Sequence, residues 1–386
     1  MKISQKVMKE TKIKYQCPKC KEGAIDYFED RLHCRSCSQE YEFRRGVPIL
    51  DVGDRNNEYV CDNFDSEQRD TECQPFYKVS PHSGAIGVDN PDRFLDEVEQ
   101  RGWRPALENL WGAGSAGLLR AVAPNRVAWK YLLEIDRSWK ALDIGAGTGG
   151  LSCRLAEECS VVALDKSWCD AVFIHLRAQQ DRLSRLEAIV AEATYLPFES
   201  NQFDLTTMIG SLEWIPTTWP QNHPRQTQLQ ALREIYRVLK PNGKLFLGIE
   251  NRLYLGYFLG IKEPHTNLKY ISLMDKEKAE ILSQDLRGQP YLEVTYSKDE
   301  YIELLNEAGF DNIQAFWLYP DYSTPHYIIP LEKGNIIKYF IEERLNPWDF
   351  KGIRSSLFPF YRLLDPLELN NHVEFYGFLA RKSNDG

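Results

Sequence analysis

From residue 140 to residue 386, short apolar runs alternate with longer stretches in which apolar residues recur with helical spacing. Short apolar runs bounded by turn residues are typical of buried strands, and the longer periodic stretches are typical of helices. The predicted strands cover residues 141–144, 160–164, 186–191, 203–209, 244–249, 312–318 and 373–380. The helices predicted between them cover residues 150–158, 167–180, 225–239 and 298–308. This alternation predicts an α/β fold, in which helices cover both faces of a mostly parallel sheet.

Two stretches of this region do not fit the alternation, and we predict that they are insertions. One covers about 251–297, and the other covers 319–372, between the last two predicted strands. The second stretch is far longer than a hairpin connection, so we expect it to form a cap. We expect both insertions to overhang the carboxyl edge of the sheet, where open α/β sheets bind their ligands.

The N-terminal part of the chain has a different pattern. Residues 12–52 contain paired cysteines and short alternating runs, which predict a small β-rich unit with a turn at Gly46 and a last strand over 47–52. Residues 53–90 are rich in Asp, Asn, Ser, Gly and Pro. We predict that they form a linker or an irregular lid.

Two helical patterns, over 91–110 and 124–135, precede the first strand of the sheet. A chain of 386 residues is longer than one hydrophobic core usually serves. We therefore expect a small domain over 1–52 and a large domain over 91–386, joined by the predicted linker.

Composition and charge narrow the function. The formal net charge of -9 disfavours a nucleic-acid-binding surface, because such surfaces need Lys and Arg to neutralise phosphates. The Lys-rich stretch over 1–21 is a local exception, and we interpret it as a solvated terminus. The sequence contains no apolar run that could span a bilayer, and Met1 is not followed by an apolar signal core. These features predict a cytoplasmic protein without a membrane partner, in which cysteines are thiols or metal ligands.

Four of the cysteines have the spacing of a zinc site. They form two C-x2-C pairs, Cys17 with Cys20 and Cys34 with Cys37. Two matched pairs favour four thiolates around one tetrahedral zinc over the alternative of a redox dithiol. Such an ion has no open position for a reactant, so we expect a structural role. His33 is interpreted as a bystander.

The strongest chemical signal is a glycine-rich loop after the first predicted strand, with the sequence Leu-Asp-Ile-Gly-Ala-Gly-Thr-Gly-Gly over residues 142–150. Glycines at such a turn let a ligand approach the backbone closely. Gly145, Gly147 and Gly150 also satisfy G-x-G-x-x-G, and Asp165 lies where a ribose-binding acid belongs, so the loop taken alone fits a nicotinamide enzyme as well. Asp143 argues against that alternative, since a carboxylate would repel a pyrophosphate but attract the ammonium group of an amino-acid-bearing cofactor.

Two further blocks, over 191–204 and 239–245, complete a pattern that resembles the class I S-adenosylmethionine-dependent methyltransferases. The resemblance covers about 140–250 and implies a Rossmann-like sheet and S-adenosylmethionine as cofactor. It assigns the methionine part of the cofactor to the glycine loop, the ribose to the end of the second strand, the adenine to the end of the third and the methyl group to residues 209–214. The residues implied are Asp143, Gly145, Ala146, Gly147, Gly149, Asp165, Lys166, Glu192, Ala193 and Ile209. The family often has Asp at the position of Glu192.

The N-terminal unit resembles the zinc-ribbon domain of the Trm112 methyltransferase activator. The likeness rests on the cysteine pairs and on the Gly-Val-Pro-Ile-Leu segment over 46–50. Domains of this kind lie beside or before methyltransferases. The resemblance implies that this chain joins such a ribbon to a catalytic domain.

The sequence leaves the methyl acceptor open. Hydroxyl and ammonium acceptors must lose a proton, and the candidate bases are Glu213, His265 and His326, although either histidine alone is also compatible with a surface or capping role. The aromatic-rich insertions favour O- or N-methylation of a small or medium organic molecule, such as a sugar or a natural-product intermediate. Two alternatives stay open: an RNA methyltransferase that uses the ribbon for recognition, and a cofactor-binding partner protein without catalysis.

Overall fold

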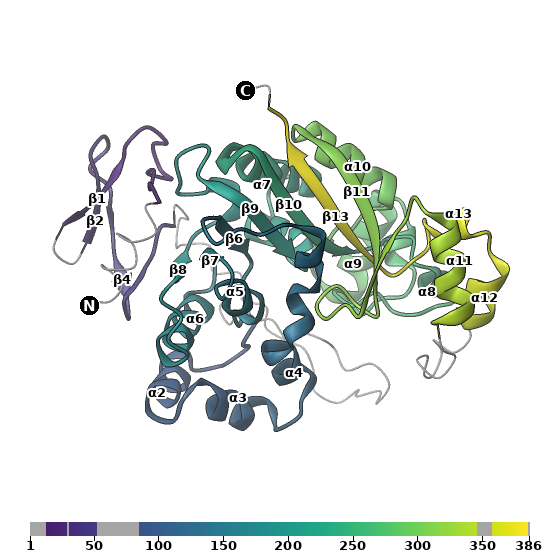
Figure 1. Cartoon of the computed structure of the whole chain (residues 1–386), viewed down its shortest axis with the longest axis horizontal. Helices are drawn as coiled ribbons and strands as arrows, with labels where there is room; N and C mark the ends of the chain where they lie inside the picture. The colour runs from purple at the N-terminus through teal and green to yellow at the C-terminus, as the bar shows by residue number, and fades with distance from the viewer. Residues whose placement is uncertain (1–12, 29–30, 52–84, 346–356, 385–386) are drawn as a thin grey trace.

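The computed structural model describes residues 13–28, 31–51, 85–345 and 357–384. Its centre is a twisted sheet of eight strands in the order β12-β11-β13-β10-β9-β6-β7-β8 (Figure 1). The strands are β6 (Lys140–Ile144), β7 (Ser160–Asp165), β8 (Leu186–Val190), β9 (Phe203–Ile209), β10 (Leu239–Glu250), β11 (Phe310–Tyr319), β12 (Tyr327–Pro330) and β13 (Phe375–Lys382). The strands from β8 to β10 run parallel, whereas β13 is antiparallel to both β10 and β11.

Helices cover both faces of this sheet, which confirms the predicted fold class. On one face α7 (Pro224–Val238) and α10 (Lys298–Glu307) share a core with strand residues such as Leu142 and Val162. On the other face α5 (Gly150–Leu155), α6 (Trp168–Gln180) and the 3-10 helix η1 (Pro124–Leu132) pack on Ala141, Val161 and their neighbours. Successive strand residues therefore enter opposite cores, as the alternation of side chains along a strand requires.

The predicted helix over 91–110 is wrong in one respect, because it is two helices: α2 (Pro91–Arg101) and α3 (Trp103–Trp111). The break falls at Gly102, whose φ of 96° is incompatible with a continuous right-handed helix. The predicted helix over 124–135 is the 3-10 helix η1. A short helix between them, α4 (Ala116–Val122), was not predicted.

The first insertion contains α8 (Leu255–Phe258), the 3-10 helix η4 (Ile271–Leu273) and α9 (Lys276–Arg287). The second insertion begins after β11. Its first element is β12, which pairs antiparallel with β11 and extends the sheet by a strand that was not predicted. Helices α11 (Gly334–Glu343), α12 (Leu357–Leu363) and α13 (Pro366–Leu369) complete it and gather at one end of the molecule (Figure 1).

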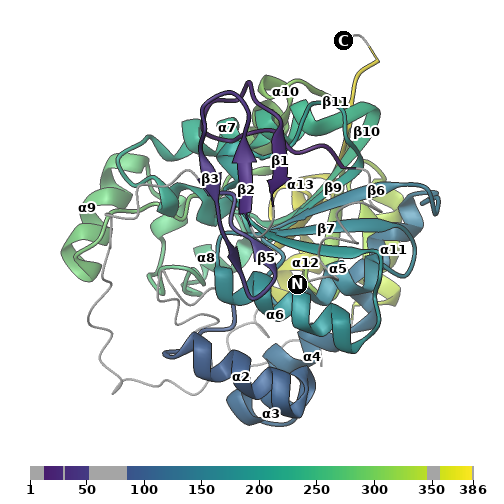
Figure 2. The ribbon, with the colours of Figure 1, turned by 90° about the vertical axis from the view of Figure 1, so that its left-hand side faces the viewer.

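The cysteine-bearing segment lies against the β8 edge of the sheet (Figures 1 and 2). It forms two small antiparallel sheets from the strands β1 (Ile25–Phe28), β2 (Arg31–Cys34), β3 (Glu40–Tyr41), β4 (Phe43–Arg44) and β5 (Val47–Pro48). The predicted strand over 47–52 pairs with β4 for only two residues, and then the N–H of Leu50 donates to the carbonyl of Val190 at 2.8 Å.

Side chains join this segment to the large domain. The Tyr15 ring lies 5.4 Å from that of Phe198, and its hydroxyl donates to Glu187 at 2.5 Å. Tyr15, Leu32 and Leu50 belong to the same apolar core as the β8 face of the sheet. The two regions therefore share one core where the sequence pattern suggested separate domains.

Several predicted features lie outside the described residues. They are the Lys-rich stretch up to residue 12, most of the predicted linker or lid over 53–90, and residues 346–356 of the second insertion.

Candidate functional site

The glycine-rich loop connects β6 to α5 in a conformation that only glycine adopts easily. Gly145, Gly147 and Gly149 have φ values of 70°, 54° and 69°. A Cβ atom on Gly145 would lie 2.5 Å from the Cβ of Ser211, so that position also has no room for a side chain. The backbone of Ala146 is fixed by a hydrogen bond to the carbonyl of Leu164 at 3.1 Å. The absence of side chains on these glycines therefore lets neighbouring groups approach the loop backbone closely.

Asp165 ends β7 beside this loop. Its carboxylate accepts hydrogen bonds from the backbone N–H groups of Gly147 at 2.8 Å and Ser167 at 2.9 Å. Burial raises the pKa of this carboxyl group, and the two backbone donors oppose that shift. The acid is therefore tied to the loop that would hold the rest of the cofactor.

Asp143 is enclosed more deeply. It is 3% exposed, and its oxygens accept hydrogen bonds from Thr207 at 2.8 Å and from the hydroxyl of Ser152. Burial raises the pKa of Asp143. These bonds hold the ends of β6, β9 and α5 together, a structural role that the sequence did not indicate.

The other implied cofactor residues lie along the same carboxyl edge. Glu192 follows β8, and burial raises its pKa to about 7; Ala193 begins the 3-10 helix η2 (Ala193–Tyr195). Lys166 follows β7 and donates to the Thr218 hydroxyl at 3.2 Å. Ile209 ends β9. The strand order thus places every implied cofactor residue on one edge of the sheet.

A segment just before α2 lies on the glycine loop. A Cβ atom on Gly147 would come within 3.0 Å of the Ala85 side chain. The buried carboxylate of Asp170 in α6 accepts the N–H groups of Ala85 at 2.6 Å and Ile86 at 3.3 Å, which fixes this segment in place. This contact places the described end of the predicted linker or lid against the glycine loop.

Acidic side chains and one histidine meet at the carboxyl ends of β9 and β10. Glu213 lies in the 3-10 helix η3 (Leu212–Thr218), Glu250 ends β10, and His265 comes from the first insertion. The Nε2 atom of His265 lies 3.7 Å from one oxygen of each glutamate. Its Nδ1 atom is 2.5 Å from Glu263, and the Trp214 ring packs edge-on against the imidazole at 5.0 Å. We call Glu213, Glu250, Glu263 and His265 the acidic cluster.

The acidic cluster is buried, and burial governs its proton affinities. The side chains of Glu213, Glu263 and His265 are 0%, 2% and 4% exposed. Burial, with the nearby charge of Glu213, raises the pKa of Glu250 to about 8. Burial alone would lower the pKa of His265, but the surrounding carboxylates raise it well above its ordinary value.

A short chain of contacts connects the acidic cluster to the glycine loop. The Tyr322 hydroxyl, from the second insertion, donates to Glu250 at 2.8 Å. The same ring lies so close to Gly210 that a Cβ atom there would be 2.6 Å from it. The next residue, Ser211, packs on Gly145 and donates to the Ile144 carbonyl at 3.1 Å. The cluster therefore borders the cofactor loop, and both insertions contribute to it.

The structure brings together two of the three candidate bases. Glu213 and His265 face each other, whereas His326 is exposed at the turn before β12, where its backbone N–H bonds to Tyr319. Glu250, Glu263 and Tyr322 were not among the predicted site residues. A usable signal existed for Glu250, because an acid at the end of a continuous apolar strand reaches the ligand-binding edge of the sheet, as Asp165 does.

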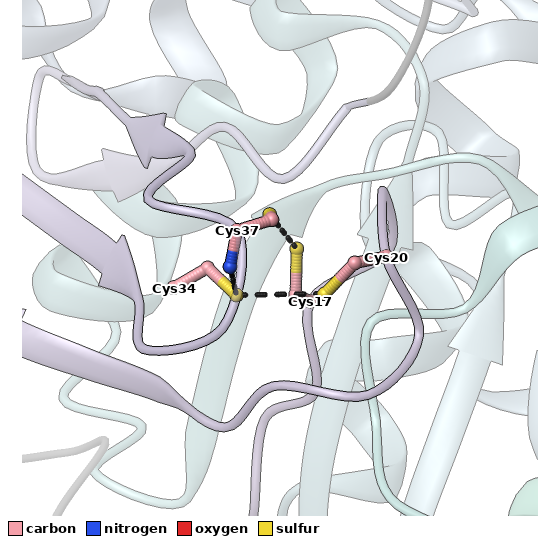
Figure 3. Close-up of side chains that lie close together, drawn as sticks. All are labelled: Cys17, Cys20, Cys34 and Cys37. Atoms are coloured by element: carbon pink, nitrogen blue, oxygen red, sulfur yellow. Dashed lines mark hydrogen bonds between the residues drawn. The ribbon is translucent and has the colours of Figure 1, made fainter.

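The four cysteines of the N-terminal segment converge on one point (Figure 3). The Sγ atoms of Cys17 and Cys37 are 3.7 Å apart, those of Cys20 and Cys34 are 3.6 Å apart, and all four lie within 4.8 Å of one another. Thiolates around a tetrahedral zinc are separated by about 3.8 Å, so this geometry fits the ion. Gly23 leaves the necessary room, since a Cβ there would be 2.4 Å from the sulfur of Cys34.

Comparison with known proteins agrees with the site. The family model for a methyltransferase domain matches residues 142–247, which run from β6 to β10. The ubiquinone/menaquinone biosynthesis C-methyltransferase UbiE of Bartonella quintana (strain Toulouse) is 30% identical over 212 residues, covering 52% of this chain and 74% of that protein. The chain belongs to the S-adenosylmethionine-dependent methyltransferases. It is therefore an enzyme of the class that the glycine loop and the blocks over 191–204 and 239–245 indicated.

Other similarities are more distant. The mitochondrial 2-methoxy-6-polyprenyl-1,4-benzoquinol methylase of Caenorhabditis elegans is 28% identical over 197 residues, covering 47% of this chain and 62% of that protein. A structure of Haemonchus contortus phosphoethanolamine N-methyltransferase 2 with S-adenosyl-L-methionine has a TM-score of 0.42 and 18% identity, covering 77% of this chain and 61% of that one. Among the described residues, none of the helices combines the length and apolar character needed to cross a bilayer.

Proposed function

We propose that this enzyme methylates a small or medium organic molecule held between the cofactor loop and the two insertions. The observation that carries the proposal is the acidic cluster, which borders the glycine loop and receives side chains from both insertions. Ligands of open α/β sheets bind at this carboxyl edge. A buried group of carboxylates with one histidine suits a hydroxyl or amine better than an anionic phosphate backbone.

The residues on the cofactor side fit S-adenosylmethionine. Asp165 would accept the ribose hydroxyls, Glu192 and Ala193 would meet the adenine edge, and the glycine loop would face the methionine part. When bound, the cofactor supplies an electrophilic methyl group on a sulfonium. The protein must then hold the acceptor close and aligned, and such positioning can supply much of the rate enhancement.

On the acceptor side, Glu213 and His265 are the favoured groups for binding the acceptor and receiving its proton. Their side chains are buried and lie 3.7 Å apart, whereas His326 is exposed. A general base works within hydrogen-bonding reach of the proton it removes. The geometry therefore favours O- or N-methylation with these two side chains at the acceptor.

A second candidate is methylation of a ring carbon. The UbiE relatives are named C-methyltransferases of quinone biosynthesis, which favours a hydroxylated ring as acceptor. Removing a hydroxyl proton makes the neighbouring ring carbons more nucleophilic. The acidic cluster would therefore have the same task in both reactions, and analysis of the product distinguishes them.

The acceptor class can be tested without knowing its identity. We expect the enzyme, given S-adenosylmethionine with a labelled methyl group and a cell extract, to label the small-molecule fraction. Ribonuclease should leave that labelling unchanged, and added salt should affect it weakly, because few phosphate contacts are involved. Label that appears in RNA and falls steeply with salt would instead establish the RNA alternative.

We propose further that Cys17, Cys20, Cys34 and Cys37 hold one structural zinc, in a domain like that of Trm112. The distances between their sulfurs support this, and an ion of this kind contributes folding free energy to the segment that binds it. The segment is also bound to β8 by the hydrogen bond from the N–H of Leu50 to the carbonyl of Val190, two residues before Glu192. The zinc would thereby stabilise the adenine side of the cofactor site without entering the chemistry.

Loss of the zinc should therefore have two effects. Replacing Cys34 by Ser should lower zinc from one ion per chain toward none, expose residues 13–51 to proteases and weaken cofactor affinity moderately. Metal analysis, limited proteolysis and calorimetry measure the three. Cys159→Ser is the matched control, because Cys159 is buried and lies outside the cluster. A zinc-free Cys34→Ser protein as protease-resistant as the parent would contradict the structural role.

A further inference from the structure

The acidic cluster carries more negative charge than its protein partners balance. Three buried carboxylates surround one imidazole, so even a fully charged His265 would leave an excess of negative charge. In the part of the chain that the structure describes, the ion pairs of Glu213 and Glu250 are all with His265. Buried carboxylates are costly unless a proton or a cation compensates them.

The hydrogen bonds of the cluster are also incomplete. Within the described ranges, both oxygens of Glu213 and the Oε2 atom of Glu250 are buried and accept no hydrogen bond. Buried polar groups in native proteins nearly always have a partner, so such atoms call for a ligand. Glu263 differs, since it accepts from the Thr266 hydroxyl at 2.8 Å and from the backbone N–H of Thr266 at 2.7 Å.

The orientation of His265 completes the pattern. Its Nδ1 atom, 2.5 Å from Glu263, is positioned to donate to that carboxylate, which leaves Nε2 directed at Glu213 and Glu250. A histidine held by a carboxylate through one nitrogen commonly binds a metal with the other, because the carboxylate fixes the ring and its tautomer. Trp214 further restricts the ring.

We propose that Glu213, Glu250 and the Nε2 atom of His265 bind a divalent cation of the Mg²⁺ or Mn²⁺ type. One donor atom from each residue lies within 4.8 Å of the others, and the Nε2–oxygen separations are 3.7 Å. Adjacent ligands of an octahedral ion with bonds near 2.1 Å are about 3 Å apart, so a small contraction of the cluster completes the geometry. Carboxylate and imidazole ligands suit such an ion.

The role of this ion toward the acceptor rests on the proposed function, whereas metal binding itself does not. Three protein ligands leave positions free in an octahedral shell, and an acceptor oxygen can occupy one of them. A bound cation lowers the pKa of a coordinated hydroxyl. The ion would then bind the acceptor and ease the loss of its hydroxyl proton, which would pass to a carboxylate oxygen of the acidic cluster that does not bind the ion. The acceptor class would be a molecule with a hydroxyl, or with two neighbouring oxygens.

Manganese binding to the full chain, with its cysteine-bound zinc retained, tests the proposal. Mn²⁺ is the probe because it prefers oxygen and nitrogen donors to the thiolates of the zinc site. We expect one Mn²⁺ per chain by electron paramagnetic resonance, with nitrogen coupling from the His265 imidazole and an upward shift of the thermal unfolding midpoint. Glu213→Gln and His265→Asn should abolish both signals. Glu293→Gln should keep both, since that buried glutamate pairs with Arg287 instead.

The outcomes separate this proposal from the proposed function. Saturable binding with nitrogen coupling in the parent protein supports the metal site even if one variant fails to fold. The metal site is overturned if the parent protein binds no Mn²⁺, or if the parent and a folded Glu213→Gln protein bind it equally. In that case shared protons, and not a cation, compensate the buried carboxylates. Methyl transfer that continues in a chelator specific for the exchangeable ion would overturn its role in activation while leaving the enzyme class intact.

Discussion

Replacing Asp165 by Ala is expected to weaken S-adenosylmethionine binding by about 2–4 kcal/mol, or roughly 30-fold to 1,000-fold. The reason is the loss of two charge-assisted hydrogen bonds to the ribose hydroxyls. The mutation also frees the N–H of Gly147, which the carboxylate now holds at 2.8 Å, so the loop loses an anchor. Titration calorimetry measures the change directly.

Two further proteins complete that experiment. Asp165→Asn keeps a hydrogen-bond acceptor at this position but removes the charge. Its affinity for the cofactor should therefore lie between those of the parent protein and Asp165→Ala. Glu157→Ala is the control. It removes an exposed acid just after α5 that pairs with Arg154, and this variant should bind the cofactor as the parent protein does. Unchanged affinity in Asp165→Ala, or a preference of the parent protein for NAD, would refute the assignment of the cofactor site.

Replacing His265 by Asn is expected to lower turnover by about 100-fold to 10,000-fold, the range for loss of a positioned acid–base group. Cofactor affinity should be retained, because the imidazole faces the acceptor side and not the ribose or adenine side. Release of S-adenosylhomocysteine with the active small-molecule fraction as acceptor measures turnover. Calorimetry of the same protein measures cofactor affinity.

The informative comparison is with the other candidate histidine. His326 is exposed and is not a member of the acidic cluster, so His326→Asn should lower turnover far less than His265→Asn does. Circular dichroism must show that both variants are folded, since His265 is the more buried of the two. Equal losses in both, or full activity in a folded His265→Asn protein, would contradict the role given to the acidic cluster.

Local patterns in the sequence were sufficient for the sheet and the cofactor side. Apolar runs located the strands of the central sheet except β12, and the glycine loop together with the blocks over 191–204 and 239–245 indicated the class of enzyme. The reason is that both signals are contiguous: a strand is one run, and the loop follows it directly. Gly102 shows the limit, because its positive φ breaks a helical pattern that remains continuous in the sequence.

The acceptor side could be predicted only in part. Glu213 and His265 are 52 positions apart in the sequence, and nothing local connects them with Glu250 or Tyr322. Their proximity depends on how two insertions fold back over β9 and β10. The merger of the cysteine-bearing segment with the sheet was missed for the same reason, since the contact of Tyr15 with Phe198 joins distant residues whose patterns each fit a separate unit.

A crystal structure of the enzyme with S-adenosylhomocysteine tests the central claim most directly, because it locates the sulfur that carries the methyl group before transfer. The account predicts that the ribose hydroxyls bind Asp165 and the adenine lies beside Glu192. It also predicts that the sulfur faces Glu213 and His265, with space for a small acceptor between them. A product bound away from the glycine loop, or a sulfur directed away from the acidic cluster, would contradict the account.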